Sequence, residues 1–265
     1  MVLVVDIGNT NIVCGVYKDD TLIWHVRLRT DRGRTSDEYF GLLTSIKGNV
    51  WAVELIRHIA IASVVPDMTR MWLHLFNKYF PVKACIIDGY TPLGLSYVVD
   101  DPGFIGADLI VNALAAWKKY KSTCIIIDFG TATTLQLVTS TGKFMGAIIA
   151  PGIRTAATEL FEKAALLSEI ELTTPTSTLG TNTQDALLSG IVKGHALMTD
   201  SFIKQILNDY AAYNPIIAIA TGGIADLIVP LVPSINYLDK TLTLDGLLLA
   251  AKQCITKTNE KVLNV

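Results

Sequence analysis

One short stretch near the N-terminus most constrains what this chain can fold into. Residues 2–5 form an apolar run that predicts a buried strand, and the run ends on Asp6, followed closely by Gly8 and small polar residues. A second apolar-rich run covers 12–17, so residues 8–11 should form the turn of a β-hairpin. Such a turn exposes backbone N–H groups and hydroxyls that can cradle a polyphosphate, and an acid at the strand end can hold Mg²⁺, directly or through water. The alternative is an ordinary hairpin whose Asn and Gly only supply a positive φ.

The same pattern occurs a second time. Residues 125–134 again give an apolar run, an acid at Asp128, a glycine shortly after it, and then hydroxyls. Strand-like runs follow both copies, at 12–17 and 22–28 after the first, and at 135–138 and 144–149 after the second. Internal repetition therefore predicts two copies of one unit. Two facing acidic hairpins would hold a nucleotide phosphate between two similar domains, an arrangement that resembles the actin, sugar-kinase and Hsp70 superfamily.

Composition agrees with a two-domain α/β protein. The chain has 265 residues, of which 51% are hydrophobic and 17% charged, so both halves can bury a core. No run of about 18 apolar residues lacks Gly, Pro or polar breaks, so we expect no membrane span. The net charge of −2 and the pI near 6.1 give no footprint for nucleic acid. We place the division between the two domains at residues 1–117 and 118–265, with a cleft between them.

The cysteines and histidines indicate no metal site. Cys14, Cys85, Cys124 and Cys254 are scattered, mostly inside apolar runs, without a C-x-x-C motif. We expect them to be reduced core residues of a cytoplasmic protein. The N-terminus lacks a basic segment and Asp6 interrupts its first apolar run, so we expect no signal peptide. The four histidines are isolated and receive no role.

The first half predicts the element order β-β-β-α-β-α-β, one compact α/β unit. Ser36 and Asp37 are predicted to cap the first helix. Arg27, Arg29, Arg32 and Arg34 form a basic cluster that could meet a phosphate or carboxylate, although a solvated loop is the more ordinary interpretation. The expected strands and helices cover residues 21–29, 38–47, 58–65, 68–80 and 83–88.

Asp108 is the candidate catalytic acid or base. It follows a loop with two Pro-containing turns and lies in the first turn of a helix defined by apolar residues at helical spacing, from Ile110 to Trp117. An acid there favours the helix macrodipole, which alone explains most such residues. A general base could occupy the same position if the helix end faces the cleft, and the helix dipole and Mg²⁺ would keep it ionised.

The second half contains three further candidate turns. Residues 151–154 lead into a helix, and Thr183 lies at the start of a long helix reaching about residue 210, where Thr181 and Gln184 have capping-box spacing. Thr183 is a second cap candidate, although a helix N-terminus there could equally receive a substrate anion. Gly190 and Gly194 inside this helix predict close helix–helix approach. A last strand ends in Thr221-Gly222-Gly223, which is either a plain glycine turn or a place for adenosine to approach the backbone.

No Walker lysine motif, kinase catalytic-loop motif or G-x-S-x-G motif is present in the sequence. Phosphate handling must therefore depend on turns, hydroxyls, acids and a bound cation. Over nearly its whole length the chain resembles the type III pantothenate kinases, which phosphorylate pantothenate in the first step of coenzyme A synthesis. The segments that carry the resemblance are 6–11, 63–66, 106–108, 128–134, 151–154, 182–183 and 221–223.

The resemblance implies a homodimer of the actin-like superfamily that uses ATP, Mg²⁺ and a monovalent cation, K⁺ or NH₄⁺. It implies that Asp108 takes the proton from pantothenate's primary hydroxyl, that Asp128 holds the monovalent cation, and that Asp6 lies near Mg²⁺. The positions implied for ATP are Asp6, Ile7, Gly8, Asn9, Thr10, Asn11, Ile12, Val13 and Thr131, with Gly222 and Gly223 at the adenosine turn. Those implied for pantothenate are Tyr97, Gly106, Ala107, Asp108, Leu109 and Thr183.

Two positions depart from the family pattern. The family usually has Arg where this chain has Leu109, and an acid where it has Gln136. A guanidinium grips a carboxylate in a way that Leu does not, although Arg154 or the basic cluster could compensate. Two alternatives therefore stand beside pantothenate phosphorylation. One is a kinase for another hydroxylated small acid, and the other is a non-catalytic regulatory protein like Bvg accessory factor. The presence of Asp6, Asp108 and Asp128 together favours catalysis.

Overall fold

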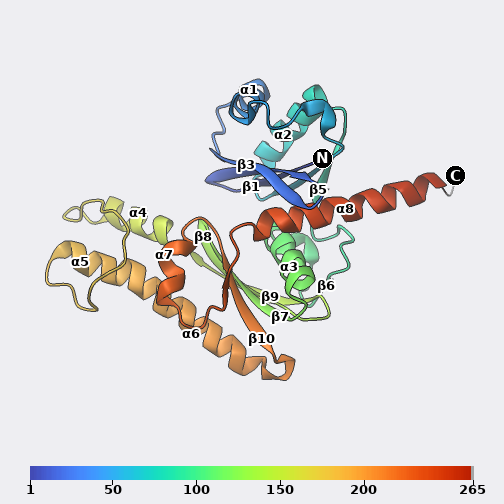
Figure 1. The fold of residues 1–265 in the computed structure, drawn as a ribbon. Coiled ribbons are helices and arrows are strands. Elements are labelled where there is room, and N and C mark those ends of the chain that lie inside the picture. The colour runs from blue at the N-terminus through green and yellow to red at the C-terminus, as the bar shows by residue number, and fades with distance from the viewer. Residues whose placement is uncertain (264–265) are drawn as a thin grey trace. The chain divides into compact units, whose positions relative to one another are not determined.

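The computed structural model describes residues 1–263, and their side chains through residue 254 (Figure 1). The chain divides into two compact units, each with its own sheet, and each is described by itself. The first unit contains residues 1–95, 99–115 and the C-terminal helix, and the second contains residues 96–98 and 116–241. The sequence-based division at 117/118 thus lies close to the change of unit inside one helix. The C-terminal helix belongs to the first unit, although it comes last in the chain.

The first unit is built on a five-stranded mixed sheet with the order β3-β2-β1-β4-β5. β1, β2 and β3 form an antiparallel meander, while β4 and β5 run parallel to β1. Helices α1 and α2 cover one face of this sheet, and α3 and α8 lie on the other (Figure 1). The strands are β1 (Val2–Ile7), β2 (Asn11–Lys18), β3 (Thr21–Arg29), β4 (His58–Ser63) and β5 (Ala84–Ile87), and the helices are α1 (Ser36–Lys47), α2 (Pro66–Tyr79), α3 (Ala107–Tyr120) and α8 (Leu242–Leu263).

Alternation along β1 assigns its side chains to the two faces. Leu3, Val5 and Ile7 pack into a core with α1 and α2, whose large members include Tyr39 and Trp72. Asp6 therefore points to the other face, together with Val4 and Val2. The predicted order β-β-β-α-β-α-β is confirmed. The cap of α1 was predicted one residue too late.

Thr35 caps α1 in a capping box with Glu38: Glu38 N donates to Thr35 Oγ1 at 3.3 Å, and Thr35 N donates to the Glu38 carboxylate at 2.7 Å. Ser36 and Asp37 are instead the first two helical residues. The reciprocal pair requires Glu three positions after the cap, and only Thr35 satisfies that spacing here.

The second unit repeats the topology of the first. Its sheet has the order β11-β10-β7-β8-β9-β6, so β9-β8-β7-β10-β11 corresponds strand for strand to β3-β2-β1-β4-β5, and β6 is an addition at the edge. The predicted duplication of one α/β unit is thereby confirmed. The strands are β6 (Ser96–Tyr97), β7 (Thr123–Phe129), β8 (Ala132–Val138), β9 (Lys143–Pro151), β10 (Ile216–Thr221) and β11 (Tyr237–Leu238).

Helices α4 to α7 pack one face of this sheet, with a core that includes Ile125, Ile127 and Phe129. The long helix predicted from about 183 to 210 is interrupted by a π-helical turn, Ser189–Lys193. The helices are α4 (Ile153–Lys163), α5 (Thr183–Leu188), α6 (Gly194–Asp209) and α7 (Ala225–Ile228), and short 3₁₀ turns cover Val53–Leu55, Pro102–Phe104, Ala211–Tyr213 and Val229–Leu231.

The expectation of four reduced cysteines was wrong for one pair. Cys85 on β5 and Cys254 on α8 are joined as a disulfide, with their Cα atoms 6.9 Å apart. Cys14 and Cys124 are free and buried, as predicted. The two bonded cysteines are 169 positions apart in the sequence, so no local spacing could indicate the pair. Among the described residues, no helix is both long and apolar enough to cross a membrane.

Candidate functional site

The first predicted phosphate turn forms as expected in the first unit. Residues 8–11 connect β1 to β2, and Gly8 N donates to Asn11 O at 2.9 Å. The residue after β3 closes over this turn: Thr30 Oγ1 donates to Gly8 O at 2.7 Å, and Thr30 N donates to Thr10 O at 2.9 Å. The turn is thus held by a neighbouring strand, which sequence reasoning missed because Thr30 lies 20 residues away from Thr10.

Asp6 lies where β1 ends, on the sheet face that α3 and α8 share. Its side chain is half-buried. The parallel neighbour β4 ends at the same edge, and Val64 N donates to Ile7 O at 3.1 Å just beyond the strand. The carboxyl ends of β1 and β4 therefore meet beside the first phosphate turn.

The helix with the candidate base begins at this same edge. A methyl group added to Gly106, directly before α3, would lie 3.6 Å from Val64 Cγ1. Asp108 is in the first turn of α3, as predicted, and its Oδ1 accepts a hydrogen bond from Leu109 N at 2.9 Å. The first unit thus brings residues 6–13 and 106–109 to one edge of its sheet.

Burial raises the pKa of Asp108 above the ordinary aspartate value, and hydrogen bonds from Leu109 N and its own N oppose that rise. Desolvation is the largest of these effects. The expectation that the helix dipole and Mg²⁺ together keep this acid ionised stays a prediction. A carboxylate with a raised pKa is a stronger base. A raised pKa therefore suits a carboxylate that must accept a proton near neutral pH.

The second predicted phosphate turn forms in the second unit. Asp128 lies near the end of β7 and pairs in register with Thr221 of β10. Gly222 has φ +100°, and a methyl group on it would lie 2.5 Å from Asp128 Oδ1. The predicted cation ligand and the predicted adenosine turn, which includes Gly223, are thus neighbours.

The turn at 130–131 rests on the start of α4. Thr131 O accepts from Gly152 N at 3.0 Å and from Thr155 Oγ1 at 2.7 Å. A side chain at Gly152 would collide with the carbonyls of Gly130 and Thr131. The segment 151–154 therefore holds the second phosphate turn, in the way that Thr30 holds the first.

Two of the predicted acceptor residues lie elsewhere in the second unit. Tyr97 belongs to the short edge strand β6 and packs its ring against Phe144 of β9, with centroids 6.1 Å apart. Thr183 is the first residue of α5. The cap of α5 is Asn182, whose side chain accepts from Asp185 N at 2.9 Å, so the predicted caps Thr181 and Thr183 were wrong.

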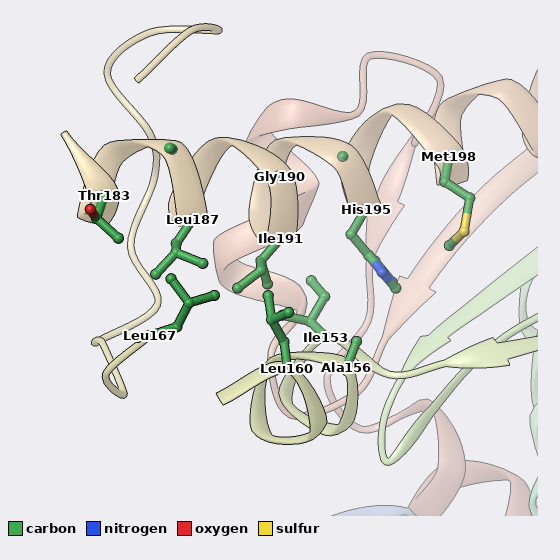
Figure 2. Close-up of a pocket in the computed structure, with 12 residues that line it drawn as sticks. Ile153, Ala156, Leu160, Leu167, Thr183, Leu187, Gly190, Ile191, His195 and Met198 are labelled. Atoms are coloured by element: carbon green, nitrogen blue, oxygen red, sulfur yellow. The ribbon is translucent and has the colours of Figure 1, made fainter. Parts of the chain in front are cut away.

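Thr183 lies at one end of an apolar groove of about 620 Å³ between α4 and the α5–α6 helices (Figure 2). In Figure 2 the side chain of Leu187 of α5 points toward Leu167, and that of Ile191 points toward Leu160 of α4. Gly190 and Gly194 also border the groove, and a methyl group on Gly190 would meet nothing within 4 Å. The predicted close helix–helix approach at these glycines was therefore wrong, because their missing side chains leave the groove open.

His195 is a site neighbour that sequence reasoning did not assign. It lines the same groove, and its Nε2 lies 2.8 Å from the hydroxyl of Thr133 on β8, with both residues buried. Burial lowers the pKa of His195, which favours the neutral ring. The 62 residues between the partners left no pattern from which this contact could be predicted.

No three His, Cys, Asp or Glu side chains gather as a metal cage among the described residues.

Comparison with known proteins decides the family. The sequence model of the type III pantothenate kinases matches residues 2–205. The chain belongs to the type III pantothenate kinases. The curated type III pantothenate kinase of Roseiflexus castenholzii is 40% identical over 250 residues, covering 93% of this chain and 96% of the relative. That of Exiguobacterium sibiricum is 41% identical over 248 residues, covering 93% and 97%.

Solved structures show that this pantothenate kinase has the actin-like ATPase and sugar-kinase fold. A dehydratase activator of Clostridium difficile superposes with a TM-score of 0.57 at 14% identity, covering 100% of this chain and 97% of the other. The ROK hexokinase of Thermus thermophilus gives a TM-score of 0.52 at 11% identity, with coverages of 97% and 99%. A Campylobacter jejuni protein of the Baf family of transcriptional activators gives a TM-score of 0.60 at 18% identity, with coverages of 96% and 99%. At such identities the likeness concerns the fold alone.

Proposed function

We propose that this type III pantothenate kinase uses Asp108 as the general base in the phosphorylation of pantothenate by ATP. The reaction itself follows from the family: the chain is an ATP-dependent kinase that makes 4'-phosphopantothenate, the first step of coenzyme A synthesis. The observation that carries the assignment is the position of Asp108. It begins α3 at the edge where β1 and β4 end, and burial raises the pKa of its carboxyl group.

In the proposed step, the Asp108 carboxylate accepts the proton of pantothenate's primary hydroxyl as that oxygen bonds to the γ-phosphorus of ATP. The bond from the γ-phosphorus to the β,γ-bridging oxygen breaks, and ADP leaves with the electron pair. Phosphoryl transfer needs alignment and charge neutralisation more than covalent help, which agrees with a site made of turns and acids.

We propose that Asp6 holds Mg²⁺, directly or through water, and that Asp128 binds K⁺ or NH₄⁺. The cations would supply positive charge at the triphosphate, which no Walker lysine supplies in this chain. Residues 6–13 and Thr131 would contact the phosphates of ATP through backbone N–H groups and hydroxyls. The C. difficile activator with the same fold was solved with bound ADPNP, which supports nucleotide binding here.

Gly222 and Gly223 would face adenosine. Gly222 has φ +100° and no room for a side chain, so the backbone itself forms the surface of this turn. A flat base can approach such a surface closely.

For the acceptor, we propose that Gly106, Ala107, Asp108, Leu109, Tyr97 and Thr183 contact pantothenate. The side chain of Leu109 is aliphatic and offers no charge to a carboxylate, and only 7% of its surface is exposed. This favours a test of other hydroxylated acids as a second acceptor class. A screen that compares kcat/KM for each such acid with kcat/KM for pantothenate distinguishes a pantothenate kinase from a kinase for another acceptor.

We further propose that the chain is a homodimer and that a second copy covers the apolar groove beside α5. Leu166 and Leu179 lie in the loop between α4 and α5 of the same unit and are 95% and 85% exposed, so this segment also offers apolar surface that a second copy would cover. Sedimentation of the purified chain and of Gly190→Asp tests this. A dimer that Gly190→Asp turns into a monomer supports the proposal, and a wild-type monomer opposes it.

The function is tested with purified protein, ATP, Mg²⁺ and pantothenate, with and without K⁺. We expect ADP release that requires pantothenate and increases with K⁺, and a product whose mass is that of pantothenate plus one phosphoryl group. ADP release independent of pantothenate would contradict the assigned acceptor. Because the reaction consumes ATP, we also propose a cytoplasmic location.

A further inference from the structure

The sheet of the first unit carries a row of residues that links Asp6 to the basic cluster. Asp6 of β1 pairs with Val13 of β2, and Val13 pairs with Arg27 of β3. Directly paired residues point to the same face of a sheet, so Asp6, Val13 and Arg27 share the face of α3 and α8. Neighbouring strands are about 4.8 Å apart, so Arg27 lies two strand spacings, about 10 Å, from Asp6.

The next pair in the ladder adds a second guanidinium on this face. Asn11, the last residue of the phosphate turn, pairs with Arg29. Two positions separate Arg27 from Arg29, so alternation directs both side chains to the same face. Thr30, the residue after Arg29, holds the carbonyl of Gly8, which fixes the end of β3 against the turn.

This part of the face is open, although the adjacent part is covered. Gly15 lies two residues after Val13 on β2 and on the same face of the sheet. A methyl group on Gly15 would lie 3.2 Å from Leu244 of α8, so α8 covers the sheet at this position. At the neighbouring Val13–Arg27 pair, Val13 is half-buried and Arg27 is exposed. Among the described residues neither Arg27 nor Arg29 has a hydrogen bond or ion pair to its guanidinium group, unlike Arg34, whose Nε lies 3.3 Å from Asp31.

The duplicated unit shows that the fold does not require these arginines. The corresponding row in the second unit runs from Asp128 through Thr134 to Ile149, and Ile149 is 70% exposed. The same place on the same topology is therefore uncharged there. Two cations without a partner among the described residues thus lie beside the first phosphate turn, on a row whose counterpart in the second unit carries no charge, and this indicates a binding role.

We infer that Arg27 and Arg29 bind phosphate oxygens of the nucleotide held by the first phosphate turn. This inference rests on the proposed function, since it names two further residues for the same nucleotide site. A triphosphate carries more negative charge than Mg²⁺ neutralises, and a guanidinium presents paired N–H donors that match two phosphate oxygens. The two arginines supply cationic contacts at a site that lacks a phosphate-binding lysine motif.

The test compares Arg27→Gln, Arg29→Gln and the double variant with wild type. Arg70→Gln is the matched control, because Arg70 is an exposed arginine on α2, across the sheet, where it is paired with Asp67. Removing one charge-assisted hydrogen bond weakens affinity by roughly tenfold. We therefore expect KM for ATP to rise about tenfold in each single variant, with KM for pantothenate unchanged. Arg27→Lys should restore part of the affinity, since it keeps the charge but not the fork.

A second readout does not depend on turnover. Binding of a non-hydrolysable ATP analogue should weaken in the double variant and become much less dependent on salt, whereas adenosine, which has no phosphates, should bind equally to all variants. Unchanged KM for ATP and unchanged analogue binding in the double variant would overturn the inference. A rise confined to KM for pantothenate would also overturn it, because the arginines would then bind the acceptor's carboxylate.

These outcomes are separable from failure of the proposed function. Wild-type protein that does not phosphorylate pantothenate would contradict the function, yet the comparison of analogue with adenosine would still decide the role of the arginines.

Discussion

Gly222 lies so close to Asp128 that a methyl group on it would come within 2.5 Å of the carboxylate oxygen Oδ1. The same methyl group would lie 2.5 Å from Phe129 N, and the backbone at Gly222 has φ +100°. The glycine turn after β10 and the acid at the end of β7 thus form one packed structure in the second unit. The proposed adenosine contact and the proposed cation ligand depend on each other for their positions.

We expect Gly222→Ala to weaken both ATP binding and activation by K⁺, because the methyl group must displace Asp128 or the turn. Overpacking of this kind costs about 1–3 kcal/mol. Titration of activity against ATP and K⁺ measures the effect. Gly48→Ala is the control, since Gly48 also has a positive φ, 52°, but its added methyl group would meet nothing within 4 Å. Equal effects of the two variants on K⁺ activation would contradict the packing argument.

The acid limb of the pH profile should report Asp108. Burial raises the pKa of Asp108, and only the ionised form can accept the proton, so kcat/KM should fall with decreasing pH at a value above the ordinary aspartate pKa of about 3.9. The ionised form is also the one that folding disfavours. Stability should therefore decrease as pH rises from the ordinary pKa through the raised one.

Urea unfolding at several pH values checks the stability part of this prediction. Asp108→Asn should remove that segment of the pH dependence while the rest of the curve is kept. An acid limb at the ordinary aspartate value would show that Asp108 is solvated during turnover.

Thr30→Val should weaken ATP binding without unfolding the chain. The hydroxyl of Thr30 holds Gly8 O at 2.7 Å, and removal of one such bond costs about 1 kcal/mol, or a severalfold rise in KM for ATP. Thr44→Val is matched, because Thr44 Oγ1 donates to Phe40 O at 2.9 Å within α1, away from the turn. If both variants change stability equally but neither changes KM for ATP, Thr30 only supports the fold.

Reduction of the Cys85–Cys254 bond should lower the free energy of unfolding by about 2–5 kcal/mol, because the bond links β5 to α8 across a long stretch of chain. Wild-type protein should melt earlier with a thiol reductant, whereas the double variant Cys85→Ser with Cys254→Ser should melt at one temperature in both conditions. In the proposed cytoplasmic location, cellular thiols such as glutathione would act to reduce this disulfide. Peptide masses that show both cysteines reduced in protein purified without reductant would contradict the pairing.

Much of this fold could be predicted because its signals are local. The apolar runs ending on Asp6 and Asp128 indicated the first strand of each unit. The repetition of this sequence pattern indicated the duplicated topology. Helical spacing after Asp108 placed that acid in the first turn of α3.

The features that sequence could not supply depend on residues far apart in the chain. Thr30 on Gly8, Thr133 on His195 and Cys85 on Cys254 are contacts of this kind. The glycines of the α5–α6 helices were misread for another reason, since an empty position beside Gly190 can mean close packing or an open groove, and composition does not distinguish the two. The raised pKa of Asp108 likewise follows from burial, which spacing does not reveal.

The central claim is that Asp108 removes the acceptor's proton, and turnover by Asp108→Asn tests it most directly. The variant keeps the size of the side chain and removes its basicity. We predict that pantothenate-dependent ADP formation falls by about 10²–10⁴-fold, while binding of a non-hydrolysable ATP analogue and the cooperativity of unfolding stay at wild-type levels. Turnover within a few-fold of wild type in Asp108→Asn would contradict the account.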